Sequence, residues 1–169
     1  MKEHIIHPFE PVYNSECIML VLGTIPSPVS REKNFYYGNP RNRFWQVLSA
    51  VFDEPVPFSI DDKINFVLRH HIALWDVLAS CDIDGADDSS ITHPVANDFD
   101  PLLQQTKITR IYTTGEKAYK LYTALARKKT GIPAVKLPST SPANGAFPIN
   151  TLIDYYMCLK TGVSQPVMK

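Results

Sequence analysis

The chain has 169 residues, enough for one domain with a buried core. Its 17 basic and 17 acidic residues give a formal net charge of zero, which excludes the strong overall positive field of many nucleic-acid-binding proteins. The sequence has no apolar run long enough to span a bilayer, and its three cysteines lack the Cys-x-x-Cys spacing of redox and metal sites. We therefore expect a single cytoplasmic domain over residues 1–169, with reduced thiols.

The first half of the chain predicts one buried strand followed by two helices. Residues 1–16 show little periodicity and are interpreted as a lead-in segment. The continuous apolar run over 17–22 ends at a glycine and predicts a fully buried strand. Apolar side chains recur at helical spacing over 43–51, and Ser59 can cap a second helix over 59–69.

The second half predicts three further strands that alternate with helices. A strand over 71–78 precedes an acidic, serine-rich stretch over 82–95, which is interpreted as an exposed loop. The remaining predicted elements are, in order, a short helix from 97 or 98 to 105, a strand over 110–114, a helix over 116–128, a strand over 134–138, a loop over 139–145 and a helix over 149–160. This alternation predicts an α/β fold whose parallel sheet is covered by helices on both faces.

The loop that follows the first strand gathers side chains suited to binding a nucleotide. Before the next helix it contains Tyr36, Tyr37, Asn39, Arg41 and Asn42. Aromatic rings can stack on a base, carboxamides can hydrogen-bond its edge, and guanidinium groups can bind phosphate. Because ligand sites of open α/β sheets lie at such strand ends, this loop is the first candidate for a binding site.

Three sequence motifs stand at the ends of predicted strands. They are Gly-x-x-Pro-Ser over 23–27 with Tyr-Tyr-x-x-Pro-x-Asn-x-Phe-Trp over 36–45, then Ala-Leu-Trp-Asp-Val-Leu-Ala-Ser-Cys over 73–81, and then Leu-Pro-Ser-Thr-Ser-Pro-Ala-Asn over 137–144. In this order they resemble the uracil-DNA glycosylase superfamily, above all its hypoxanthine-DNA (deoxyinosine) glycosylase branch, over residues 17–156. The resemblance implies a three-layer α/β/α sandwich around a short four-stranded parallel sheet. It also implies a monofunctional glycosylase without metal or cofactor.

The same resemblance implies that the enzyme flips a deaminated base, with hypoxanthine the expected one, and hydrolyses its N-glycosidic bond. Asn42 is then the catalytic residue, unless its carboxamide only caps the helix that begins beside it. Tyr37 matches the aromatic residue that stacks on the flipped base, and Gly23 leaves room for the turn off the strand. Ile25 stands where several sister families place a water-positioning Asn or Asp. An isoleucine side chain cannot polarise water, so the catalytic role is expected to fall to Asn42.

Two other residues of the predicted base-binding site have open roles. Asn39 replaces a histidine that is more common in this branch, and it either hydrogen-bonds in the site or forms an Asn-Pro turn. Asp76, at the end of the second predicted strand, either holds the pocket through hydrogen bonds or is a plain structural cap. The adjacent His70 and His71 do not predict a zinc site, because neighbours on a strand point to opposite faces.

Several short polar or basic side chains are expected to contact the DNA backbone around the flipped nucleotide, because hydroxyl, amide and guanidinium groups donate to phosphate oxygens. Ala143 stands where some relatives carry a bulky leucine wedge. A methyl group fills little of the gap left by a flipped base, so bases that are already poorly paired should be favoured. The predicted DNA-contacting residues are Ser27, Ser30, Arg41, Ser139, Ser141, Ala143 and Asn144.

The sequence leaves other functions open. The same chemistry could serve uracil or xanthine, and the chain could be a nucleotide- or DNA-damage-binding module without catalysis. A serine hydrolase based on Ser27 or Ser141 is disfavoured, because the sequence lacks a Gly-x-Ser-x-Gly elbow. The preferred hypothesis is a monomeric DNA glycosylase, with damaged DNA as its partner and no association with membranes.

Overall fold

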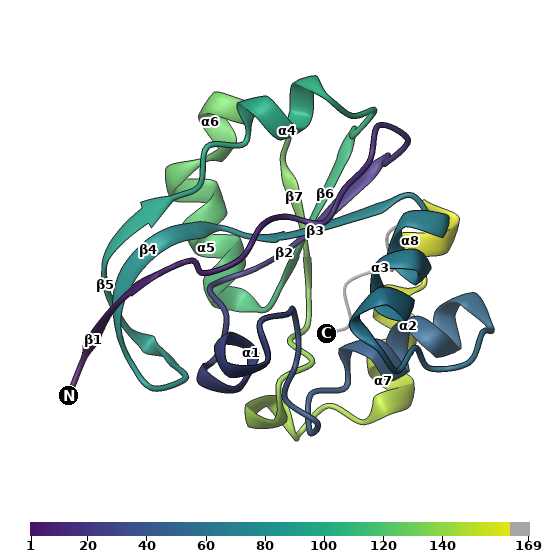
Figure 1. Ribbon diagram of the computed structural model, residues 1–169, viewed down its shortest axis with the longest axis horizontal. Coiled ribbons are helices and arrows are strands. Elements are labelled where there is room, and N and C mark those ends of the chain that lie inside the picture. Colours follow the sequence, from purple (N-terminus) through teal and green to yellow (C-terminus); the bar gives the residue numbers. More distant parts are fainter. Residues whose placement is uncertain (163–169) are drawn as a thin grey trace.

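The central sheet has four parallel strands in the order β3-β2-β6-β7 (Figure 1). The computed structural model describes residues 1–162. The strands of this sheet are β2 (Met19–Gly23), β3 (Ile72–Asp76), β6 (Arg110–Thr114) and β7 (Ala134–Leu137), which overlap the four predicted strands. Because β2 is central and its register sets Gly23 opposite Asp76, the ends of β2, β3 and β6 meet at one edge of the sheet.

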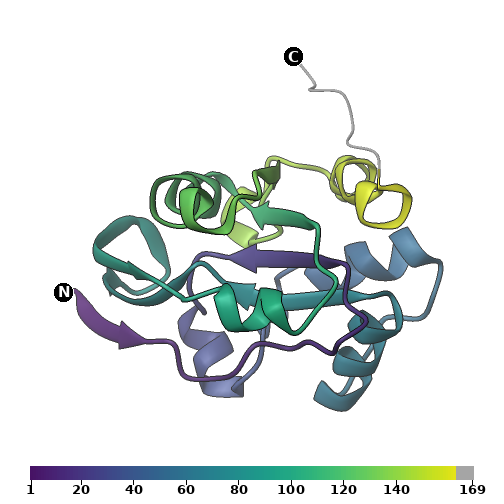
Figure 2. The same cartoon turned by 90° about the horizontal axis from the view of Figure 1, so that it is seen from above.

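Helices cover both faces of the sheet, and each face has its own core. Along β2, Val21 packs into one core, whereas Leu20 and Leu22 pack into the other. This alternation follows from the opposite orientation of neighbouring side chains on a strand. One face carries α2 (Phe44–Phe52), α3 (Ile60–Arg69), α7 (Ile149–Tyr156) and α8 (Cys158–Thr161), and the other carries α4 (Asp100–Gln104), α5 (Glu116–Leu125) and α6 (Arg127–Thr130). The predicted three-layer α/β/α sandwich is confirmed, and Figure 2 shows the same arrangement from above.

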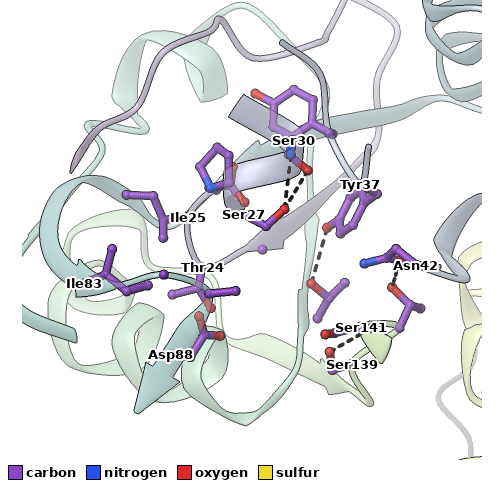
Figure 3. Close-up of a pocket in the computed structure, with 18 residues that line it drawn as sticks. Thr24, Ile25, Ser27, Ser30, Tyr37, Asn42, Ile83, Asp88, Ser139 and Ser141 are labelled. Atoms are coloured by element: carbon purple, nitrogen blue, oxygen red, sulfur yellow. Dashed lines mark hydrogen bonds between the residues drawn. The ribbon is translucent and has the colours of Figure 1, made fainter. Parts of the chain in front are cut away.

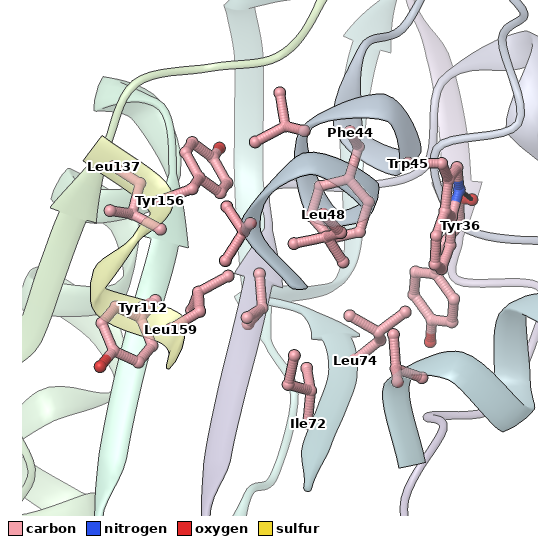
Figure 4. Packing of buried hydrophobic residues seen from close by; sticks show 14 of the residues in the cluster. Tyr36, Phe44, Trp45, Leu48, Ile72, Leu74, Tyr112, Leu137, Tyr156 and Leu159 are labelled. Atoms are coloured by element: carbon pink, nitrogen blue, oxygen red, sulfur yellow. Dashed lines mark hydrogen bonds between the residues drawn. The ribbon is translucent and has the colours of Figure 1, made fainter. Parts of the chain in front are cut away.

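The core beneath α2 anchors the start of that helix. Phe44 and Leu48 are fully buried against the sheet, and Trp45 is buried beside them (Figure 4). Burying a large apolar side chain contributes about 1.5–3 kcal/mol, so these residues fix the helix firmly. The loop that precedes Phe44 is therefore held at the edge of the sheet.

The acidic stretch over 82–95 is a β-hairpin, so its prediction as an exposed loop was wrong. Strands β4 (Leu78–Asp84) and β5 (Asp87–Ala96) pair antiparallel, and β1 (Glu3–Ile6) adds to β4 to form a second, three-stranded sheet. Residues 1–16 are therefore more than a lead-in segment. Ile83 and Ile91 are buried while most of their neighbours face solvent. The sequence of the hairpin therefore contains few of the buried apolar positions from which strands are predicted. Pro94 is tolerated because β5 is an edge strand.

Smaller differences concern where helices begin and end. The helix predicted over 59–69 is confirmed, and Ser59 forms a capping box with Asp62. The short helix predicted from 97 or 98 begins only at Asp100. The two helices predicted over 116–128 and 149–160 are each divided into two shorter ones, α5 with α6 and α7 with α8. Helix α1 (Pro28–Lys33) was not predicted.

The structure also bears on the state of the cysteines and on whether a helix could span a membrane. The three cysteines, Cys17, Cys81 and Cys158, are buried and free, in agreement with the expected reduced thiols. Within residues 1–162, no helix combines the length and apolar character needed to cross a membrane.

Candidate active site

A pocket opens at the edge where the parallel strands end (Figure 3). The ends of β2, β3 and β6, the loop before α2, the β4–β5 turn and the loop after β7 form its walls. Its volume of about 130 Å³ is below the ~300–1,000 Å³ of pockets that enclose drug-sized ligands, so it suits one flat ring system. The predicted site residues that line it are Gly23, Ile25, Ser27, Ser30, Tyr37, Asn42, Asp76, Ser139 and Ser141.

Tyr37 forms a flat aromatic wall of this pocket. Its ring stacks on Phe44 with centroids 3.7 Å apart and planes 11° from parallel, and its hydroxyl lies 3.3 Å from the Thr114 hydroxyl. The backbone of Tyr37 is left-handed, with φ at 53°, which is unusual for an aromatic residue. Burial raises the pKa of Tyr37, and the charge of Asp76 adds to the rise, so the hydroxyl stays neutral. A stacking surface is therefore fixed in place.

Asn42 presents only one end of its carboxamide to the pocket. Its Oδ1 accepts a hydrogen bond from the backbone N–H of Phe44 at 2.9 Å and another from the hydroxyl of the buried Thr140 at 2.7 Å. The backbone donor identifies which end of the amide is oxygen. The amide nitrogen consequently points into the pocket, as Figure 3 shows. The N-cap of α2 is Arg43 and not Asn42, but the Asn42 side chain still binds the N–H of the first helical residue, Phe44, and it also offers a donor to a ligand.

Asp76 lines the pocket as a buried residue, directly beside Gly23. A Cβ atom on Gly23 would lie 2.5 Å from Asp76 Oδ1, so the strand end has no space for a side chain. The other carboxylate oxygen, Oδ2, lies 2.7 Å from His7 Nε2, and both side chains are almost fully buried. Asn97 donates from its side chain to the Asp76 carbonyl. These contacts fix the direction of the Asp76 carboxylate.

Ser27, at the N-cap of α1, and Ser30, within α1, mainly organise this segment of the chain. Ser27 caps α1 by accepting from the backbone N–H of Ser30, and its hydroxyl donates to the Ser30 hydroxyl. Ser30 is 3% exposed, and its hydroxyl accepts from the N–H of Gly38. Ser27 lies at the pocket wall, whereas Ser30 supports the loop that carries Tyr37.

The loop after β7 forms the opposite wall and is tied to the start of α2. Ser139 accepts from the N–H of Ser141, Ser141 accepts from the N–H of Ala143, and Asn144 donates to the Ser139 carbonyl. Arg43 donates to the carbonyls of Phe147 and Asn144, and its N–H donates to the Thr140 carbonyl. Ala143 is exposed within a short 3₁₀ turn, Pro142–Asn144, beside the pocket.

Three other predicted residues contribute little polarity to the pocket. Asn39 accepts from the N–H of Arg41 at 2.9 Å, which favours the turn over a role in the site. Arg41 is exposed outside the lining residues. The Ile25 side chain points towards Ile83 in Figure 3, and it packs in the core on the β4 side.

Two ionisable groups at this site were not predicted from the sequence. His7 reaches Asp76 from the lead-in segment, and Asp88 lines the pocket from the hairpin. Neither belongs to a motif: the pairing of β1 with the distant β4 brings His7 to the site, and the β4–β5 hairpin brings Asp88. An alternation of apolar and polar positions within the acidic stretch is the sequence signal that indicates such a hairpin.

Comparison with known proteins gives four findings. No family model matches the chain. The chain is 34% identical to a hypoxanthine DNA glycosylase of Methanosarcina acetivorans over 144 residues, which covers 84% of this chain and 90% of the relative. It is 33% identical to a hypoxanthine DNA glycosylase of Methanosarcina barkeri over 92 residues, or 54% of this chain and 58% of that protein. A solution NMR structure of a candidate uracil DNA glycosylase from Methanosarcina acetivorans superposes with a TM-score of 0.76 at 30% identity, covering 92% of this chain and 99% of that one.

Proposed function

Because the chain belongs to the hypoxanthine-DNA glycosylase branch of the uracil-DNA glycosylase superfamily, it is a DNA repair glycosylase, and we propose that hypoxanthine is the base it removes. The enzyme flips the deaminated nucleotide out of the duplex and hydrolyses the bond between base and sugar, which leaves an abasic site. We also propose that residues 1–169 act as one domain, as a cytoplasmic monomer.

The observation that carries this proposal is the direction of the Asn42 amide nitrogen. A base that enters the pocket stacks on the face of Tyr37 that Phe44 leaves open, and its carbonyl oxygen meets the Asn42 N–H₂ group. As the glycosidic bond breaks, its electron pair moves onto the base. A fixed donor at the carbonyl oxygen stabilises this developing negative charge. Asn42 therefore acts on the leaving base, because its oxygen is already engaged and does not orient a water molecule.

Asp76 supports recognition of a deaminated base. Deamination turns adenine into hypoxanthine, and the ring nitrogen N1 changes from an acceptor into an N–H donor. A carboxylate accepts from such an N–H and repels the lone pair of adenine. Uracil and xanthine also carry a ring N–H beside a carbonyl, so Asp76 favours all three deaminated bases over adenine. The order among the three then depends on the shape of the pocket.

The DNA backbone is proposed to lie along the mouth of the pocket. Hydroxyls of Ser27, Ser139 and Ser141 stand at its walls, and Arg41 is exposed on the loop before α2. Such groups position a flipped nucleotide through its phosphates without reading the sequence. Asn144 organises the loop after β7, and Ala143 forms its exposed tip.

Single-turnover excision, with enzyme in excess over labelled duplexes that carry inosine, uracil or xanthine, tests the proposed function. We expect alkali-labile abasic sites at inosine to form much faster than at uracil. Cleavage at uracil alone would retain a glycosylase but reject hypoxanthine as its substrate. Specific binding without cleavage at any of the three would favour the non-catalytic damage-binding module.

Replacing Asp76 with asparagine should lower the single-turnover excision of hypoxanthine by about tenfold or more, since a hydrogen bond to a charged group contributes about 1.5–3 kcal/mol. The exposed Asp154 of α7 provides the matched control, and Asp154→Asn should keep the wild-type rate. Rates are compared after a thermal melt has shown that both variants are folded. An unchanged rate in Asp76→Asn would contradict a role in base recognition.

A further inference from the structure

Asp88 is a second carboxylate in the wall of the pocket, and it comes from the hairpin at the start of β5. Figure 3 shows its side chain beside Thr24, across the pocket from Asn42. Asp88 is exposed, whereas Asp76 is only 4% exposed and lies deeper in the pocket. The two carboxylates therefore stand at different depths.

Hydrolysis of a glycosidic bond needs a group that accepts a proton from the attacking water. The Asn42 oxygen already accepts two hydrogen bonds, and Ile25 has no polar side-chain atom. Within the part of the chain that the structure describes, the residues lining the pocket include two carboxylates, Asp76 and Asp88, and no histidine. The choice of a proton acceptor is thus narrowed to these two aspartates.

The depth at which each carboxylate lies in the pocket indicates which of the two accepts the proton. A flipped nucleotide enters a pocket base first, so its sugar carbon C1′ remains near the mouth. The deeper Asp76 is on the side of the base of a nucleotide bound in this way, and it is already bonded to His7. The exposed Asp88 is on the side of the sugar, where the water attacks.

We infer that Asp88 is a further catalytic residue, the base that takes a proton from the water attacking C1′ of the flipped nucleotide. This inference rests on the proposed glycosylase function of the pocket. In the step, the water oxygen bonds to C1′ while the bond from C1′ to the base nitrogen breaks and leaves its electron pair on the base. The water proton moves to the Asp88 carboxylate, and the base leaves as an anion that Asn42 stabilises until solvent protonates it.

The surroundings of Asp88 suit a proton acceptor. Loss of hydration against the pocket wall raises the pKa of Asp88, and the polar side chain of the neighbouring Thr24 partly offsets this rise. Among the charged groups nearby, Asp76 of β3 and the adjacent Asp87 raise this pKa further, and Lys117 of α5 lowers it. A carboxylate whose pKa lies above the usual range is a stronger base once it is ionised.

The test compares Asp88→Asn with Asp87→Asn, which removes one charge from the same turn and leaves the pocket carboxylate intact. Single-turnover excision from an inosine duplex is measured between about pH 4 and 8, around the ordinary aspartate pKa of about 3.9. The wild-type rate should fall as the pH decreases through the raised pKa, because only the ionised carboxylate accepts a proton. Asp88→Asn should be slower on the order of 100-fold and lose this pH dependence, and Asp88→Glu should recover part of the rate. Asp87→Asn should keep the wild-type rate at neutral pH and the fall at low pH, with the inflection moved slightly to lower pH because one charge that raises the pKa of Asp88 is gone.

Three outcomes would overturn the inference. Asp88→Asn could retain the wild-type rate and pH profile, or Asp87→Asn could lose as much activity, which would indicate a general charge effect of the hairpin. Loss of affinity of Asp88→Asn for a duplex with a stable abasic-site analogue, sufficient to explain the slower rate, would assign Asp88 to binding. Failure of the wild-type enzyme to cleave any damaged base would instead reject the proposed function, and the role of Asp88 with it.

Discussion

Asn42→Ala should lower the single-turnover excision of hypoxanthine by about 10²–10³-fold while the protein still binds DNA. Loss of one fixed donor to a developing anion has an effect of this size in other enzymes. The substitution also removes the acceptor for the Phe44 N–H and the Thr140 hydroxyl, so the start of α2 should be destabilised by about 1 kcal/mol. Excision of inosine and thermal unfolding are measured on the same preparation.

Asn42→Asp separates the two roles of this side chain. Aspartate keeps an oxygen for the Phe44 N–H and for Thr140, so the helix start is preserved. It replaces the amide nitrogen in the pocket with a second oxygen, which repels an anionic leaving base. We expect Asn42→Asp to unfold at the wild-type temperature and to be at least as inactive as Asn42→Ala. An active Asn42→Asp would mean that Asn42 serves only as a cap.

Gly23→Ala should reduce excision by about 100-fold, although it adds only one methyl group. The new Cβ would lie 2.5 Å from Asp76 Oδ1, so the carboxylate must move away from the position that His7 fixes. A displacement of about 1 Å in a group that positions the substrate can cost on the order of 100-fold in rate. Overpacking of this kind also destabilises a fold by about 1–3 kcal/mol. Excision rate and thermal midpoint are both recorded.

Gly145→Ala is the matched control for this variant. A Cβ on Gly145 meets its nearest neighbour, the Pro142 carbonyl, at an ordinary 3.5 Å, and φ at this residue is −62°. We therefore expect the wild-type excision rate and stability for Gly145→Ala. Full activity of Gly23→Ala would show that the position of Asp76 is not critical.

The strands of the central sheet were predictable because they are buried on both sides. The apolar run that ends at Gly23 is a strong local signal, and the Ser59 cap is another. The hairpin carrying Asp88 was not predictable in the same way. Its polar residues face solvent, and only one buried residue, Ile91, interrupts the polar pattern of β5.

The candidate site was predictable in part, and the reason lies in chain topology. Gly23, Tyr37, Asn42 and Asp76 stand at or near strand ends, and the ends of parallel strands meet at one edge. His7 meets Asp76 across 69 positions in the chain, and only the three-dimensional pairing of β1 with β4 brings it there. Contacts of this kind leave no periodic pattern in a single sequence.

The ties between the loop before α2 and the loop after β7 have a consequence for how damage is found. Arg43 and Asn42 join the two walls through Phe147, Asn144 and Thr140, so the slot for the base exists before DNA arrives. With a small residue, Ala143, at the exposed tip, little pushes a base out of its helix. Such an enzyme does not force a base out of the stack but captures bases that have already left it by spontaneous opening of the base pair. The rate at which damaged bases are recognised is then determined by how often mispaired bases open in the DNA itself.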